Sequence, residues 1–157
     1  MTAADWDRVR QIYLEGIATG NATFEQDAPS WEKWDASHRR DCRFVAREDC
    51  EVLGWAALSP VSSRCVYEGV AEVSVYVGAG ARGRGIGRLL LSDLVESSER
   101  AGVWTLQAGI FPENIASIEL HRKLRFRLVG VREKLGCMNR RWRDVALMER
   151  RSTAAGR

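Results

Sequence analysis

The segment 82–88 has the composition of an anion-binding loop. It reads Arg-Gly-Arg-Gly-Ile-Gly-Arg, so three glycines and three arginines fall within seven residues. Glycine lets the backbone approach a ligand closely, and arginine pairs with phosphate oxygens. We therefore predict that this loop contacts phosphate. The residues given this role are Arg82, Gly83, Arg84, Gly85, Ile86, Gly87 and Arg88.

The elements on either side of the loop would position it. Residues 71–77 alternate apolar and polar side chains, as in a strand with two different faces. From Ile86 onward, apolar residues recur at helical spacing. A strand that leads through glycines into a helix points backbone N–H groups at an anion beside the helix N-terminus. The alternative is a flexible surface loop that only caps the helix, and the flanking elements favour anion binding over it.

A second polar group lies in a later helix, expected over residues 112–124. Asn114, Ser117 and His121 are spaced at i, i+3 and i+7, so they share one helical face. On the residues alone, His121 is as well explained by a surface position as by a role in chemistry.

Length and composition predict one domain over residues 1–150 and a disordered tail over 151–157. A net charge of +3, without a basic run, gives no reason to expect nucleic acid as a partner. No apolar run is long enough for a membrane span, and no signal-peptide pattern is present. Four widely spaced cysteines and two histidines favour reduced thiols, a cytoplasmic location and no metal site.

The periodicity predicts an α+β fold, a mixed α/β arrangement built around the central strand, loop and helix. Strands are expected at 44–46, 52–58, 71–77, 105–110, 126–135 and 145–149, with a connecting loop at 136–144. Further helices are expected from Trp6 to Ile17 and at 31–40, with Thr2 or Asp5 as the first cap.

The spacing Arg82-x-x-Gly85-x-Gly87 resembles the pyrophosphate loop of the GNAT superfamily of acetyl-CoA-dependent N-acetyltransferases. Further segments narrow the resemblance to the phosphinothricin (methionine sulfoximine) acetyltransferase family. These segments are Ala22-Thr-Phe-Glu25, Gly54-Trp-Ala56, Ser59-Pro60, Glu72-x-Ser-Val-Tyr-Val77, Asn114-x-Ala-Ser-Ile-x-Leu-His121 and Trp142-x-Asp144. They span nearly the whole domain.

The resemblance implies a GNAT fold, in which helices flank a twisted mixed sheet that is splayed at its central strands. A splayed strand leaves N–H and C=O groups free to pair with the pantetheine amides of acetyl-CoA. Val75, Tyr76 and Val77 would lie along that arm, and 83–88 would hold the pyrophosphate. Asn114 and Ser117 would contact the cofactor on its other side.

The resemblance also suggests catalytic residues. Glu72 would take the proton that an ammonium group must lose before its nitrogen attacks the thioester, directly or through a water. A solvent-facing glutamate paired with an arginine is the alternative. His121 stands where many GNAT enzymes carry a tyrosine that protonates the departing thiolate. We expect direct transfer in a ternary complex, with Cys65 or Cys137 as the nucleophile of a less favoured acyl-enzyme scheme.

By the same resemblance, the acceptor would contact four side chains, and the protein would be a homodimer. The four residues are Phe24, Glu25, Arg64 and Tyr67. Each also has a plain explanation, with Phe24 as a core residue and Arg64 as a solvated charge.

Four departures from the family pattern stand out. Ser62 replaces an arginine, Arg125 replaces the glycine after the later helix, and Gly136-Cys-Met-Asn-Arg140 replaces a Gly-x-Lys-x-Gly loop. The chain also opens almost directly on a helix, so we expect the sheet to lack its first edge strand unless the start codon lies further upstream.

The function expected from this reading is acetyl transfer from acetyl-CoA to the α-amino group of a small amino-acid-like acceptor. Phosphinothricin, methionine sulfoximine and methionine sulfone are the acceptors that the resemblance suggests. Two alternatives stay open: a GNAT enzyme for a polyamine, an aminoglycoside or a protein N-terminus, and a non-catalytic acyl-CoA sensor.

Overall fold

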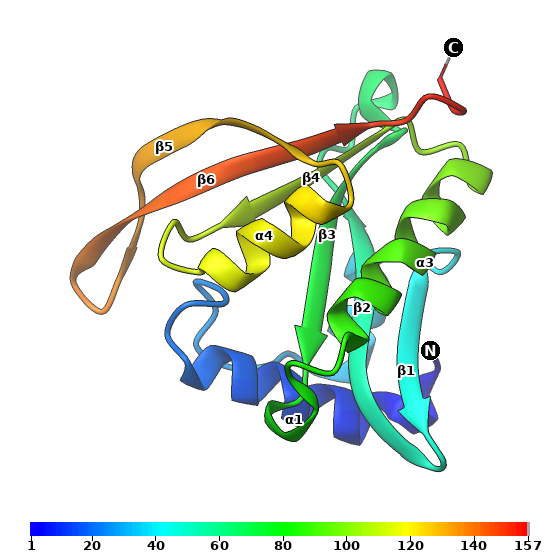
Figure 1. The fold of residues 1–157 in the computed structure, drawn as a ribbon, viewed down its shortest axis with the longest axis vertical. Helices are drawn as coiled ribbons and strands as arrows, with labels where there is room; N and C mark the ends of the chain where they lie inside the picture. The colour runs from blue at the N-terminus through cyan, green and yellow to red at the C-terminus, as the bar shows by residue number, and fades with distance from the viewer. Residues whose placement is uncertain (157) are drawn as a thin grey trace.

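A six-stranded sheet with the strand order β1-β2-β3-β4-β6-β5 is the frame of the molecule (Figure 1). The computed structural model describes residues 1–156. The strands are β1 (Arg43–Glu48), β2 (Glu51–Pro60), β3 (Val70–Val77), β4 (Thr105–Ile110), β5 (Arg127–Met138) and β6 (Arg141–Arg151). Only β3 and β4 pair in parallel, and the other neighbours are antiparallel, so the predicted mixed sheet is confirmed.

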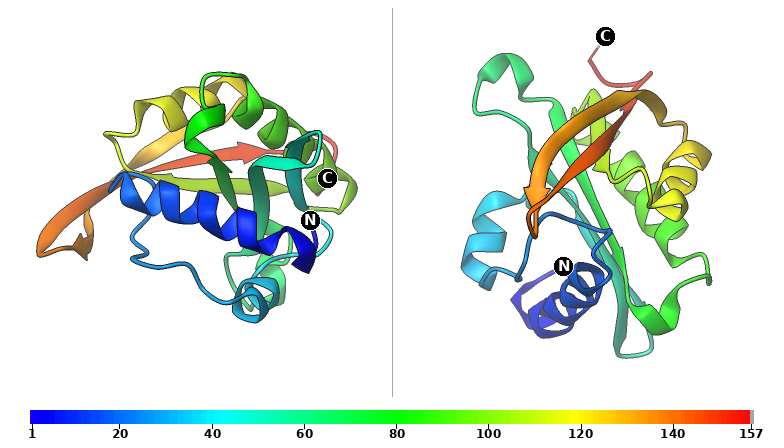
Figure 2. Two further views of the ribbon diagram at one scale, coloured as in Figure 1. Left: turned by 90° about the horizontal axis from the view of Figure 1, so that it is seen from below. Right: turned by 90° about the vertical axis from the view of Figure 1, so that its left-hand side faces the viewer.

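Helices cover both faces of this sheet (Figure 2). They are α1 (Trp6–Ala18), α2 (Trp31–Ser37), α3 (Ile86–Arg100) and α4 (Ile115–Lys123), with short 3₁₀ turns η1 (Ala3–Asp5), η2 (Cys65–Tyr67) and η3 (Ala79–Ala81). Figure 1 shows α3 and α4 on the near face, with α1 on the other. The second helix ends three residues before the expected boundary, at Ser37.

The sheet opens at its centre, as expected. Residues 70–72 of β3 pair with residues 105–107 of β4, and the pairing stops there although both strands continue. Beyond Glu72, the edge of β3 that faces β4 therefore has no ladder partner, while its other edge stays paired with β2 as far as Val77. This opening places free backbone polar groups in the middle of the fold.

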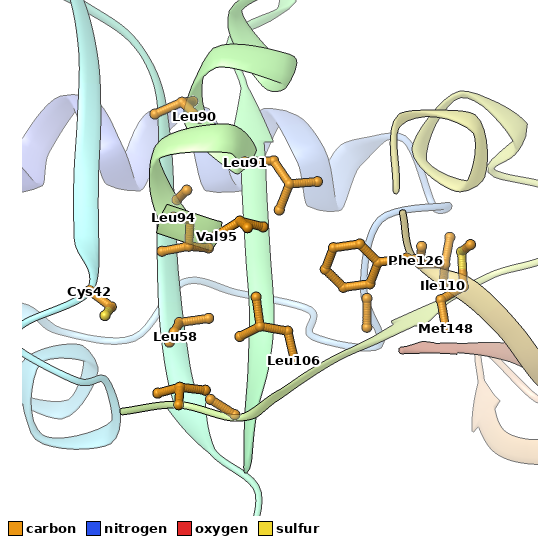
Figure 3. Packing of buried hydrophobic residues seen from close by; sticks show 14 of the residues in the cluster. Cys42, Leu58, Leu90, Leu91, Leu94, Val95, Leu106, Ile110, Phe126 and Met148 are labelled. Carbon is orange, nitrogen blue, oxygen red and sulfur yellow. The ribbon is translucent and has the colours of Figure 1, made fainter. Parts of the chain in front are cut away.

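The alternation in β3 separates two hydrophobic clusters. Val73 and Val75 pack against the cluster under α3, which includes the buried side chains Leu90 and Leu94 (Figure 3). Tyr76 packs on the opposite face, against a cluster from α1, α2 and β2. Each fully buried leucine contributes about 1.5–3 kcal/mol, so these clusters anchor β3 and α3 on both sides of the loop 78–85.

The N-terminus begins with a cap and has no strand before it in the described residues. The backbone N–H of Thr2 donates to Asp5 at 2.7 Å, and the 3₁₀ turn η1 leads directly into α1. The strand β1 therefore forms one edge of the sheet.

The prediction of a connecting loop over residues 136–144 is wrong, because β5 and β6 form a long hairpin there. Gly136 pairs with Arg143 and Met138 with Arg141, so only Asn139 and Arg140 form the turn. Both turn residues have positive φ, 52° and 62°, which matches the twist of a two-residue hairpin. Asn-Arg lacks the glycine that usually marks such a turn, so the sequence pattern did not reveal it. The hairpin projects beyond the body of the protein (Figure 2).

The C-terminal residues also differ from the expected disordered tail. Arg151 ends β6, and Ser152 donates its backbone N–H to the Trp104 carbonyl at 2.9 Å. The side chain of Arg151 donates to the Gly156 carbonyl at 2.6 Å, which folds residues 152–156 back onto the sheet. Arg157, also assigned to the tail, lies outside the described residues.

Candidate active site

A cavity of about 350 Å³ lies where β3 and β4 separate. Side chains from β3, β4, α4, the loop after α1 and the β5–β6 hairpin line it. The separation of two paired strands creates this space, and the surrounding elements form its walls. Of the expected site residues, Glu72, Val75, Tyr76, Asn114, Ser117, His121, Phe24 and Glu25 line the cavity.

Glu72 is the last residue of β3 that pairs with β4, at the point where these two strands begin to diverge. Its side chain is half-buried, and its Oε2 accepts a hydrogen bond from Gln107 Nε2 at 3.2 Å. Gln107 is the residue paired with Glu72 in the β3–β4 register. One carboxylate oxygen is therefore held by β4, which orients a group able to accept a proton inside the cavity.

His121 is buried at 4% exposure, and its two ring nitrogens have different environments. Its Nδ1 lies 2.8 Å from the Ser117 carbonyl, and its Nε2 is buried with no protein partner. Burial lowers the pKa of His121, although the hydrogen bond to Ser117 partly offsets this effect. Because a carbonyl oxygen only accepts, Nδ1 carries the proton and Nε2 is a free acceptor in the neutral ring.

Asn114 and Ser117 shape the start of α4. The Oδ1 of Asn114 accepts from the backbone N–H of Ser117 at 3.2 Å, which caps the helix. The Nδ2 of Asn114 donates to the Asn21 carbonyl at 3.1 Å. Both polar atoms of the Asn114 side chain are thus engaged within the protein, which gives this residue a structural role beside the expected cofactor contact.

The loop after α1 contributes Phe24 and Glu25 to the cavity wall. Tyr13 and Tyr76 lie beside it with ring centroids 4.9 Å apart, and Tyr76 also stacks on Trp55 at 4.7 Å. Burial raises the pKa of both tyrosines, so their hydroxyl groups stay protonated at neutral pH. The rings of Tyr76 and of Tyr13 on α1 both line the cavity.

Arg64 and Tyr67, expected at the acceptor site, are not among the described residues that line the cavity. Both side chains are exposed, Arg64 just before the turn η2 and Tyr67 at its end, and the Arg64 guanidinium lies 5.6 Å from the Tyr67 ring centroid. The turn precedes β3, next to the Gly69 carbonyl that accepts from Trp104 N–H. This contact holds the η2 segment beside the start of β4.

The loop 82–88 has the geometry of an anion cradle. Gly83 and Gly85 have φ of 76° and 82°, and a Cβ on either would meet open space. Gly85 also caps α3 without a side-chain hydrogen bond, so backbone N–H groups of the first turn stay available. These two positions need glycine for conformation rather than for lack of room.

The arginines of this loop differ in their partners. Arg82 donates from Nε to the Val77 carbonyl at 3.3 Å, and Arg84 pairs with Glu48 at 2.6 Å. Arg88 is exposed in the first turn of α3, and Ile86 packs against the core. Three positive charges at a helix N-terminus fit a pyrophosphate group. Together with the unpaired edge of β3, this donor set fits coenzyme A.

None of the four cysteines is among the described residues that line the cavity. Cys65 and Cys137 are exposed and free, and neither lines the cavity. Residues 1–156 contain no group of three side chains able to hold a metal ion. Within the same range, no helix is long and apolar enough to cross a membrane.

Gln107 and Arg132 are among the lining residues that the sequence patterns did not assign to the site. Gln107 is a polar residue inside an otherwise apolar strand, which was a usable signal. Arg132 lies on β5, and it is the only lysine or arginine among the described residues that line the cavity. Nothing local in the sequence distinguishes Arg132 from its basic neighbours.

Comparison with known proteins gives a consistent result. A model of the Acetyltransferase (GNAT) family matches residues 6–126. A phosphinothricin N-acetyltransferase of Streptomyces coelicolor is 38% identical over 154 residues, covering 93% of this chain and 90% of that protein. An L-methionine sulfoximine/L-methionine sulfone acetyltransferase of Pseudomonas paraeruginosa is 32% identical over 152 residues, covering 93% and 88%.

A solved structure shares the fold over the same extent. It is the crystal structure of a GNAT superfamily phosphinothricin acetyltransferase from Sinorhizobium meliloti in complex with acetyl-CoA. The TM-score is 0.88 at 33% sequence identity, and the match covers 99% of this chain and 87% of that chain.

Proposed function

The chain belongs to the Acetyltransferase (GNAT) family and is an acetyl-CoA-dependent N-acetyltransferase, and we propose that its acceptor is a free α-amino acid. The acceptors proposed are of the phosphinothricin, methionine sulfoximine or methionine sulfone type, as the names of the relatives suggest. The observation that carries the proposal is one cavity in which Glu72 and Glu25 lie together with Arg132. Such a cavity offers carboxylates to an ammonium group and a guanidinium to an acid group.

Acetyl-CoA supplies the acetyl group as an activated thioester. The free edge of β3 beyond Glu72 would hold the pantetheine arm as an added strand, through Val75, Tyr76 and Val77. The N–H groups and arginines of residues 82–88 would hold the pyrophosphate. The same β3 backbone donors would stabilise negative charge that develops on the acyl oxygen.

Glu72 is the proposed base for the first proton that the ammonium group loses. Its Oε2 is held by Gln107, which leaves Oε1 available toward the cavity. Direct attack of the amine then needs no acyl-enzyme, in line with the absence of cysteine from the described lining residues.

His121 requires a different role from that of a simple acid. With the proton on Nδ1 and a lowered pKa, the neutral ring has no proton to give from Nε2 at neutral pH. We therefore propose that Nε2 receives the second proton lost by the attacking nitrogen and returns it to the departing sulfur. In this scheme His121 ends each turnover as it began, and Glu72 releases the first proton to solvent.

Arg132 is the proposed partner of the acceptor's acid group. A guanidinium binds a carboxylate or phosphinate through two parallel hydrogen bonds. The family pattern places an arginine at the position of Ser62, and Arg64 lies outside the cavity wall. Arg132 from the hairpin would supply the cation instead.

A homodimer is also proposed, with a second copy of the chain against the edge strand β5. Leu128, Val129, Val131 and Leu135 on β5 and Trp142 on β6 are 43–60% exposed. Apolar side chains in a row on an edge strand favour association. Light scattering at micromolar concentration tests this, and a mass of 17.7 kDa would count against it.

The acceptor is tested by thiol release from acetyl-CoA with a panel of amines. The panel contains phosphinothricin, methionine sulfoximine, methionine sulfone, spermidine, an aminoglycoside and an alanine-initiated peptide. We expect the highest kcat/KM with one of the first three. A peptide or polyamine as the best acceptor would support the alternative enzyme, and thiol release with none of them would overturn the proposal.

The role of Arg132 is tested with matched acceptors in the same assay. Arg132→Met should raise KM for methionine sulfone on the order of tenfold or more, since a hydrogen bond to a charged group is lost. With methionine sulfone amide, which lacks the carboxylate, the variant and the parent protein should have similar KM values. An equal effect on both acceptors would remove Arg132 from carboxylate recognition.

A further inference from the structure

Arg143 is a buried charged residue that no part of the reaction scheme uses. It lies on β6, its side chain is 9% exposed, and it does not line the cavity. Its Nη1 donates to the Gly20 carbonyl at 2.9 Å, and its Nη2 donates to Asn21 Oδ1 at 2.9 Å and to Glu113 Oε2 at 3.3 Å. One guanidinium therefore joins the hairpin, the loop after α1 and the turn before α4.

An aromatic pair extends these contacts to the cavity wall. The Arg143 guanidinium carbon lies 4.0 Å from the Phe111 ring centroid, and Phe111 meets Phe24 edge-on at 4.8 Å. On the hairpin, a Cβ added to Gly136 would lie 2.6 Å from the Phe24 ring. Phe24, which lines the cavity, is thus held between Phe111 and the hairpin backbone.

The same loop is tied to the helix that carries His121. Asn114 donates from Nδ2 to the Asn21 carbonyl and caps α4 with its Oδ1. Asn21 therefore accepts two hydrogen bonds, one from Arg143 at its side-chain oxygen and one from Asn114 at its backbone carbonyl. A shift of the loop after α1 would therefore also displace the start of α4.

We propose that Arg143 is a positioning residue for the acceptor site, an inference that rests on the proposed function for the identity of the acceptor. Through Asn21 and Phe111 it holds the loop with Phe24 and Glu25 against the start of α4. The hairpin, which supplies Arg132, is thereby fixed to both. The planar fork makes several hydrogen bonds and a ring contact at once, which a lysine cannot reproduce.

The kinetic test compares Arg143→Gln and Arg143→Lys with the control Arg150→Gln. Arg150 is on the same strand, is 16% exposed and pairs with Glu99 at 2.9 Å, away from the cavity. Misplaced contacts should raise the KM for methionine sulfone on the order of tenfold in R143Q, with the KM for acetyl-CoA changed by less than about twofold. R143K should show a smaller rise and R150Q none. Equal acceptor KM values in R143Q and R150Q would overturn the proposal.

Hydrogen–deuterium exchange provides a readout that needs no acceptor. In R143Q, amides of residues 20–25 and 114–118 should exchange faster than in the parent protein, while R150Q leaves them unchanged. Should R143Q fail to fold, Asn21→Ala removes one partner of Arg143 and should show the same pattern more weakly. Unchanged exchange in these segments in the folded variants would sink the inference even if no amine of the panel is acetylated.

Discussion

At the scale of single residues, the chemistry depends on which polar atoms of Glu72 and His121 are left without protein partners. Gln107 holds one oxygen of Glu72, and the Ser117 carbonyl holds the Nδ1 proton of His121. What remains is one carboxylate oxygen and one bare imidazole nitrogen. A prearranged acceptor pair of this kind suits the two protons that an ammonium group loses during acyl transfer.

Replacing Glu72 tests its assignment as the base. Glu72→Gln keeps the shape and the contact with Gln107 but removes the proton acceptor, so kcat should fall by about 10²–10⁴-fold. The KM for acetyl-CoA should stay within about twofold of the parent value, since no cofactor contact is lost. Steady-state kinetics with acetyl-CoA and methionine sulfone measure both quantities. Glu68→Gln, on the exposed segment before β3, is the control and should retain full activity; a similar kcat for the two variants would exclude Glu72 as the base.

At the scale of elements, two features show local strain that the fold tolerates. Arg125 closes α4 with φ of 66°, in a conformation that favours glycine. The hairpin turn likewise uses Asn139 and Arg140 at positive φ. The Arg125 position was anticipated as a departure from the family's glycine, and the structure confirms that a non-glycine closes this helix.

The strain at Arg125 predicts a stabilising substitution. Arg125→Gly should raise the free energy of unfolding by about 0.5–1 kcal/mol, because an L-residue pays roughly 1–2 kcal/mol in this region and glycine gives back part of that as chain entropy. Urea unfolding measures the change. Glu96→Gly, in the exposed interior of α3, should instead lower it by about 1 kcal/mol. If R125G is as destabilising as E96G, the strain at Arg125 is not significant.

At the scale of the whole molecule, both histidines are held neutral in packed surroundings. His38 stacks on Trp34 with ring centroids 4.0 Å apart and bonds the Trp34 carbonyl through Nδ1. Burial lowers the pKa of His38, and likewise that of His121. Each folded-state pKa thus lies below the unfolded value of about 6.5. The resulting stability is present above pH 6.5 and is lost as pH falls through the folded-state values.

A pH series of unfolding experiments tests this linkage. Between pH 7 and 5, the free energy of unfolding should decrease by up to about 1.4 kcal/mol per pH unit for each histidine. The double variant His38→Gln/His121→Gln should show a shallower slope, whatever its absolute stability. The carboxyl groups of Asp41 and Glu99, whose pKa values are lowered by arginine hydrogen bonds, act only at more acidic pH. Parallel slopes for parent and variant would contradict the assignment.

The sequence by itself determined what depends on neighbours along the chain. The alternation in residues 71–77 and the helical spacing after Ile86 predicted β3 and α3, and the glycines between them predicted the turns that join the two elements. Backbone geometry sets these periods, so they can be read from one stretch of chain. The shared helical face of Asn114, Ser117 and His121 could be predicted from the sequence for the same reason, and all three residues line the cavity.

The tertiary structure alone decided which distant residues share the site. Arg143 meets Gly20, which is 123 positions away in the sequence, and Glu113, which is 30 positions away, only after the sheet has formed. The extended hairpin, the pairing of Glu72 with Gln107, and the placement of Arg132 in the cavity follow from the same strand order. Arg64 and Tyr67 lie outside the cavity because they come just before the end of β3 that is paired with β4, whereas the strands separate beyond Glu72. Long-range register depends on packing across the whole sheet, which no local pattern specifies.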